Sequence, residues 1–310
     1  MIRFIKHVPL AVSGLALGLA ALGNLLLPLG AEVRYVCGAL SFVLLLFFVL
    51  RIIFDFNQVF NELKAPVPLG VLPTSTMAVM LICIYVRPFV GDFAGYIWFA
   101  AVIIHVCIMI LFFKRFVIGF KPDNVYPSWF VAFVGIVTAS VTAPVMGFQF
   151  LGQIAFYFGF ISYFIVLILN LYKMKKRIPV TEPLRLTNAI FTAPMCLCIV
   201  GYFSSFDRQN EYLVYLMLCF AMVSYIFVIY KMLTELLRIK FYPTYAAFTF
   251  PFVISATAFR LGNEFLMQRG IGFFVPAAYI SMWIAVVIVM YVLVRYVLYF
   301  RSLLNNSDVG

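Results

Sequence analysis

Charged residues are scarce in this chain. Only 11% of its 310 residues are Asp, Glu, Lys or Arg, whereas 65% are hydrophobic, and the mean hydropathy is +1.10. This composition offers too little polar surface to cover a water-soluble globule, so the sequence predicts an all-α integral membrane protein. A helix needs about 20 apolar residues to cross the hydrocarbon core, so the length allows roughly ten crossings. We therefore expect a single transmembrane domain, residues 1–310, without a soluble domain.

Groups that carry catalysis or bind metals are also rare. The chain has two histidines, and its six cysteines lie in apolar stretches without Cys-x-x-Cys spacing. A membrane enzyme would need His, Asp or Glu gathered near one membrane face, and a metal site would need clustered ligands. The sequence thus predicts no enzymatic activity, no metal and no cofactor. We interpret His105, within an apolar stretch, as a hydrogen-bonded side chain rather than as a pH sensor.

The net charge of +11 would suggest nucleic acid as a partner if the protein were soluble. Here, however, the basic residues lie in short runs between apolar stretches, which is typical of membrane topology signals. We therefore expect no nucleic-acid partner. The run of Lys173, Lys175, Lys176 and Arg177 is interpreted first as an anchor on the cytoplasmic side, and second as a contact for anionic lipids.

Charged residues, Pro and Gly divide the chain into ten apolar stretches. They cover residues 8–28, 35–54, 69–87, 94–113, 127–147, 150–172, 186–206, 212–237, 243–262 and 273–300. Among the loops between them, one alternating set holds only Arg34, Arg87, Arg208, Arg260 and Arg269, and the other holds the remaining 17 of the 22 Lys and Arg. Because cytoplasmic loops are enriched in Lys and Arg, we expect ten transmembrane helices with both termini in the cytoplasm. The predicted location is the cell inner (plasma) membrane.

Prolines recur near the start of every odd-numbered stretch. Pro9, Pro68, Pro127, Pro183 and Pro243 follow one another at steps of 59, 59, 56 and 60 residues. Proline at the first helical position forfeits no intrahelical hydrogen bond. Such regular spacing indicates five repeats of a helical hairpin in one orientation. The alternative is that similar loop prolines arise independently in any bundle of similar helices.

The odd-numbered stretches also differ from the even ones inside the span. Four of them carry an internal proline, Pro73, Pro144, Pro194 or Pro251, and a proline inside a helix kinks it and frees a carbonyl that needs protein or water nearby. We therefore predict an inner ring of five kinked odd helices around a pore and an outer ring that faces lipid and neighbouring subunits. The candidate pore-lining residues are Ser13, Gly14, Thr74, Ser75, Thr138, Thr142, Asn188, Thr192, Thr249 and Ser255. Alternatively, these small residues only permit close helix packing.

Three short motifs resemble those of a known family. They are Tyr245-Ala246-Ala247-Phe248-Thr249-Phe250-Pro251, Lys64-Ala65-Pro66-Val67 leading into Leu72-Pro73-Thr74-Ser75-Thr76-Met77, and Pro127-Ser128-Trp129-Phe130. Together with the helix number, their order and spacing resemble the tellurite-resistance/dicarboxylate transporter family, which includes bacterial TehA proteins and the slow anion channels of plant guard cells. The resemblance, closest to the bacterial TehA-like members, covers nearly the whole chain. It implies a homotrimer in which each subunit has its own pore, and a phenylalanine gate at the position of Phe250.

The predicted inner helices carry no charged residue near mid-membrane, which argues against a buried charge relay. Backbone N–H groups and hydroxyls on kinked helices nevertheless favour anions. The first hypothesis is therefore an anion channel or uniporter with a central pore that Phe250 occludes. The alternative is a proton-coupled transporter or exporter of dicarboxylate, sulfite or tellurite-related anions. The expected partners are small inorganic or organic anions and membrane lipids.

Overall fold

The computed structural model describes residues 2–307, and every regular element within them is helical. Met1 and residues 308–310, which belong to the predicted domain, lie outside the described residues. In chain order the elements are α1 (Ile2–Lys6), α2 (Val12–Leu25), η1 (Leu27–Leu29), α3 (Ala31–Phe54), α4 (Phe56–Glu62), α5 (Pro66–Val71), α6 (Thr74–Val90), α7 (Phe93–Phe112), η2 (Phe113–Val117), η3 (Pro122–Asn124), α8 (Ser128–Phe133), α9 (Val137–Met146), α10 (Gln149–Lys175), α11 (Glu182–Arg185), η4 (Leu186–Thr192), α12 (Ala193–Ser205), α13 (Glu211–Thr234), η5 (Leu236–Arg238), η6 (Pro243–Phe248), α14 (Thr249–Met267) and α15 (Val275–Ser307).

Eight helical segments of the described chain are long and apolar enough to cross a membrane. They are Ala31–Phe54, Pro66–Val90, Phe93–Val117, Ser128–Met146, Gln149–Lys175, Glu182–Ser205, Glu211–Arg238 and Val275–Asn305. The helix α2 is a shorter apolar helix, and α14, with 19 residues, follows the short helix η6 without a gap. The prediction of a multi-pass, all-helical membrane protein is confirmed. Each of the ten predicted stretches contains a helix of the structure.

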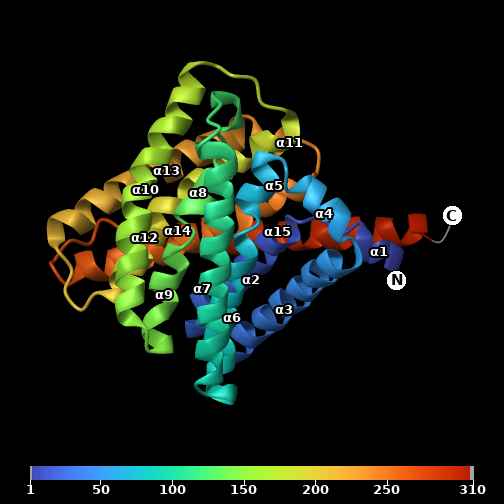
Figure 1. Cartoon of the computed structure of the whole chain (residues 1–310). Helices are drawn as coiled ribbons and strands as arrows, with labels where there is room; N and C mark the ends of the chain where they lie inside the picture. The colour runs from blue at the N-terminus through green and yellow to red at the C-terminus, as the bar shows by residue number, and fades with distance from the viewer. Residues whose placement is uncertain (1, 308–310) are drawn as a thin grey trace.

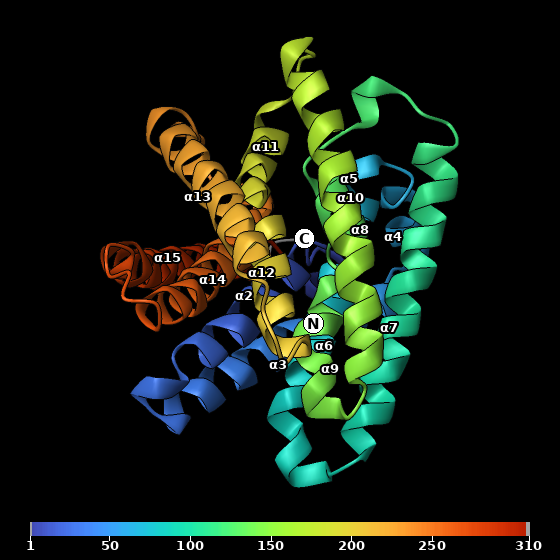
Figure 2. The ribbon, with the colours of Figure 1, turned by 90° about the vertical axis from the view of Figure 1, so that its left-hand side faces the viewer.

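Five helices contact one another in a closed cycle. Helix α2 packs against α6, α6 against α9, α9 against α12, α12 against α14, and α14 returns to α2. Each of these helices also packs against the long helix that follows it, in the pairs α2–α3, α6–α7, α9–α10, α12–α13 and α14–α15. The following helices lie toward the outside of the bundle, with α7 at one edge and α13 at another (Figure 2).

Burial separates the two sets of helices. In the three cycle segments Pro66–Val90, Ser128–Met146 and Glu182–Ser205, between 67% and 89% of the most apolar window is buried within the protein, against 22% to 39% for the outer segments. The outer helices instead expose large apolar side chains such as Phe42, Ile104, Phe150, Tyr212 and Val287. An outward apolar surface is what a helix in contact with lipid presents, because lipid tails are as apolar as the side chains.

Hydroxyl groups connect neighbouring helices of the cycle. The hydroxyl oxygens of Ser13 on α2 and Thr74 on α6 lie 2.7 Å apart, and the Ser140 hydroxyl on α9 donates to the Gly201 carbonyl of α12 at 3.0 Å. The indole N–H of Trp98 on α7 donates to the Thr142 hydroxyl on α9 at 2.6 Å. Hydrogen bonds of this kind stabilise helix association where hydrophobic burial gives no preference over lipid.

The two ends of the described chain lie on the same side of the bundle (Figure 1). The short helix α1 contacts both α3 and α15. Phe4 stacks edge-to-face on Phe47 and Phe300, with ring centroids 5.8 and 5.6 Å apart. The first and last hairpins are therefore joined directly, and α2 also packs against α15.

The close approach of α2 and α14 requires glycine at position 18. A Cβ on Gly18 would lie 2.5 Å from the Thr249 Cβ, whereas a Cβ on Gly14, one turn earlier, would lie 3.4 Å from the Ala246 Cβ. We expect Gly18→Ala to lower the free energy of unfolding by about 1–3 kcal/mol, as overpacking does. Gly14→Ala should change it by less than about 1 kcal/mol, because the contact is ordinary and alanine favours a helix. Thermal unfolding in detergent measures both, and equal effects of the two variants would contradict this packing.

Candidate pore

All five inner segments change their helical geometry partway along their length. Helix α5 ends at Val71 and α6 begins at Thr74, and α8 ends at Phe133 before α9 begins at Val137. In the fourth and fifth segments a 3-10 helix, η4 or η6, passes directly into α12 or α14, and in the first a turn separates α1 from α2. A break of this kind frees backbone carbonyls, which must find partners inside the protein because hydrocarbon offers none.

Prolines account for some of these breaks. Pro73 stands immediately before α6, Pro194 is the second residue of α12 and Pro251 the third of α14. The third segment differs, because its break falls at Val134–Ile136 around Gly135, whereas Pro144 lies inside α9 near its end. At this break the Phe130 carbonyl accepts from the N–H groups of both Val134 and Gly135, at 2.7 and 3.1 Å.

Hydroxyls at the breaks donate to the carbonyls there. Thr74, Ser75 and Thr76 donate to the carbonyls of Val71, Leu72 and Pro73, each at 2.8 Å. In the same way Thr192 donates to Ala189 at 3.2 Å, and Thr249 to Ala246 at 2.8 Å. These serine and threonine hydroxyls of the inner segments therefore donate to backbone carbonyls at the breaks.

A cavity of about 80 Å³ lies at the centre of the cycle, among the breaks. Every inner segment contributes to its wall, and none of the described residues that line it is charged. The wall consists of Ala11, Gly14, Leu17, Val67, Val71, Thr74, Met77, Phe130, Val131, Val134, Gly135, Thr187, Ile190, Ala193, Pro194, Leu197, Thr244, Ala246, Ala247, Phe250 and Pro251. Three threonines are its only side-chain hydroxyls, so the wall is mainly apolar. An ion that enters finds few ligands to replace its water.

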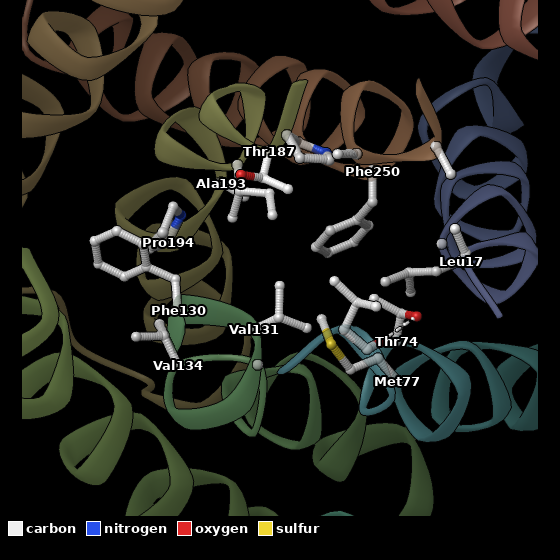
Figure 3. Close-up of a pocket in the computed structure, with 18 of the residues that line it drawn as sticks. Leu17, Thr74, Met77, Phe130, Val131, Val134, Thr187, Ala193, Pro194 and Phe250 are labelled. Atoms are coloured by element: carbon white, nitrogen blue, oxygen red, sulfur yellow. Dashed lines mark hydrogen bonds between the residues drawn. The ribbon is translucent and has the colours of Figure 1, made fainter. Parts of the chain in front are cut away.

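The Phe250 ring reaches into this cavity from α14 (Figure 3). The view shows it between Leu17 and Thr74 on one side and Thr187 and Ala193 on the other. The side chain is 94% buried, since its exposure is 6%. Just before it, the Thr249 hydroxyl lies 3.0 Å from the Gly14 carbonyl of α2, so the start of α14 is fixed against a neighbouring helix.

The predicted pore-lining residues fall into two groups. Gly14 and Thr74 line the cavity together with Phe250, Pro194 and Pro251. The others do not line it: Ser13, Ser75, Thr192, Thr249 and Ser255 donate to backbone carbonyls, Thr142 accepts from Trp98, Thr138 is buried in α9, and Asn188 lines a neighbouring cavity. The aliphatic residues of the wall, such as Val131 and Ile190, were not predicted from the sequence to line the cavity. In a chain that is 65% hydrophobic, a valine that faces a cavity looks like one that faces lipid.

The family model for voltage-dependent anion channels (SLAC1) matches residues 7–297, which is nearly the whole chain. The chain belongs to this family. No curated protein matches it. Membership in the voltage-dependent anion channel family confirms the broad resemblance and the expectation that the chain transports anions and is not an enzyme. The bacterial TehA-like assignment stays a prediction.

Water access to the cavity is testable with single cysteines. In a background that lacks the six native cysteines, Ala247→Cys should react with a membrane-impermeant thiol reagent, because Ala247 lines the cavity and is partly exposed. Ala189→Cys is the matched control, because Ala189 is fully buried in the adjacent segment and is absent from the wall. Mass spectrometry of the labelled protein gives the extent of reaction. Similar labelling at both positions would contradict the cavity.

Proposed function

We propose that the chain is an anion channel whose central pore, enclosed by the five inner segments, is closed by the ring of Phe250. The observation that carries this proposal is the position of that ring inside a cavity to which all five segments contribute. An aromatic ring in an apolar constriction stops ions because they would lose water without gaining ligands.

The preference for anions follows from charge and backbone. None of the described residues that line the cavity is acidic, and the chain carries a net charge of +11. Excess positive charge at the mouths raises the local concentration of anions, and salt weakens this effect. Because the wall offers few hydrogen-bond donors, anions that lose their hydration water at low cost should pass most readily.

We further propose the ten-helix arrangement, five hairpin repeats with both termini in the cytoplasm. Three observations support it: the closed cycle of contacts, the pairing of each inner helix with its successor, and the contact of α1 with α15. The distribution of Lys and Arg over the loops supports the orientation. The predicted homotrimer, the inner-membrane location and the TehA-like assignment rest on the family resemblance.

Proton-coupled transport of a dicarboxylate, sulfite or tellurite-related anion is the alternative. It would need a titratable group on the path that changes its protonation during transport. The described cavity wall contains no titratable side chain. Passive flux is therefore the function that this geometry favours.

The direct test is anion flux through the purified protein in liposomes. Phe250→Ala should raise the flux of chloride or nitrate by roughly tenfold or more, because each 1.36 kcal/mol removed from a barrier gives tenfold in rate. The flux should follow the anion gradient and should not run uphill when a proton gradient is imposed. Uphill movement driven by protons would support the coupled transporter instead.

Phe252→Ala is the matched control on the same helix. Its ring is fully buried against Tyr225 and does not line the cavity, so its loss should leave flux near the wild-type level. Flux is compared only between variants that elute as folded protein. If Phe250→Ala folds and conducts no more than wild type, the ring is not the gate.

A further inference from the structure

A second cavity, of about 390 Å³, lies beside the central one where α10 and α13 end. The chain leaves α10 at Lys175 and crosses to α11 at the top of the view in Figure 1, and residues 177–180 of this connection line the cavity. Thr187 lines both cavities, so the two are neighbours. The proposed gate and path do not use this second cavity.

Basic side chains dominate its polar lining. Lys173, Arg177, Arg185 and Lys231 line it, and Glu235 is the one acidic residue of the described chain that does. The two carboxylate oxygens of Glu235 are already engaged, one by Arg185 at 3.3 Å and the other by Lys231 at 3.2 Å. The cavity therefore keeps a surplus of positive charge.

Lys173 is fixed in the cavity wall. Its side chain is buried, its ammonium donates to the Asp123 carbonyl at 2.9 Å, and it lies 3.5 Å from the centre of the Tyr126 ring. An ammonium has three donors, so this geometry leaves a further one for a ligand.

Arg177 contributes a guanidinium without a counter-charge. No acidic side chain among residues 2–307 forms an ion pair with it, whereas its backbone N–H donates to the Met174 carbonyl at 3.0 Å. Its φ is 51°, a left-handed conformation that glycine usually takes after a helix. Arginine forks are suited to oxyanions, because several N–H donors converge on one group.

The rest of the lining is partly apolar and includes the polar side chains of Tyr126, Asn170, Thr187 and Asn188. Met174, Ile178, Val180, Leu184 and Phe191 share the wall with the basic residues. Next to the cavity, the outer helices expose Leu171 and Tyr172 of α10 and Tyr230 and Leu233 of α13. A ligand with both a negative head and an apolar body would match this combination, and basic pockets between transmembrane helices bind lipid headgroups in this way.

We propose that this cavity binds a phosphate group, supplied by an anionic phospholipid or free in solution. Arg177 and Lys231 hold its oxygens at the open side and Lys173 at the buried side. The apolar wall accommodates the glycerol and upper acyl chain when the source is a lipid. This site lies beside the inner segment that carries Ala193 and Pro194, so occupancy stabilises the packing of η4 against α13.

Thermal unfolding of the purified full chain in detergent tests the site without any measurement of current. Dioctanoyl phosphatidylglycerol should raise the unfolding temperature saturably, and dioctanoyl phosphatidylcholine, with the same chains, should not. Each basic side chain near a phosphate contributes about fivefold in affinity. Arg177→Gln should therefore weaken binding about fivefold, and its combination with Lys231→Gln roughly 30-fold.

Lys176→Gln is the matched control, because Lys176 is the preceding residue and does not line the cavity. It should bind like the wild type. A third arm uses inorganic phosphate: a saturable shift that Arg177→Gln weakens would assign the site to free phosphate. No shift with phosphatidylglycerol or phosphate, or a shift that Lys176→Gln weakens as much as Arg177→Gln does, would overturn the proposal. If the double variant does not fold, the comparison of Arg177→Gln with Lys176→Gln tests the proposal by itself.

Discussion

Satisfaction of the broken backbone is the constraint on which this structure depends. Each inner segment interrupts its helix inside the bundle, and the carbonyls exposed there have no water to meet them on the lipid side. Threonines and serines add donors there, as Thr74 does for Val71 and Thr249 for Ala246, whose carbonyl also accepts the backbone N–H of Thr249. Neighbouring helices cover the breaks in the inner segments, whereas the outer helices, one of which passes from α7 into the π-helix η2 near its end, carry the lipid-facing surface.

The same constraint shapes the cavity. Since most hydroxyls of the inner segments are occupied by backbone carbonyls, the space between the breaks is left with aliphatic walls and with the ring of Phe250. Gly18 allows α14 to approach α2 beside that ring, and Thr249 fixes the start of α14 against the Gly14 carbonyl. The position of the ring thus follows from backbone contacts around it rather than from polar contacts of the ring itself.

The sequence predicted the helices well because apolar length and charged loops are strong signals, and each predicted stretch contains a helix of the structure. Recurrent prolines such as Pro68 and Pro243 marked the starts of inner segments correctly. The break in the third segment was not predictable from proline, because it occurs at Gly135 while Pro144 lies near the end of α9.

The residues of the cavity wall were harder to predict than the helices. Ser75 and Thr192 are of the type expected along a polar path but donate to their own backbone. Val131 carries no sequence signal that separates it from a lipid-facing valine. Arg177 looked like one charge in an anchoring run, and only the fold brings it together with Lys231 in the lining of one cavity.

The central claim is that anions cross through the ring of inner segments and that the side chain at position 250 sets the barrier. Its most direct test is the current of the purified protein in a planar bilayer under a potassium chloride gradient, with Phe, Leu or Ala at position 250. We expect a reversal potential at the chloride equilibrium value for all three and a current that rises as the side chain becomes smaller. Reversal at the potassium value, or a current independent of the residue at 250 in folded protein, would contradict it.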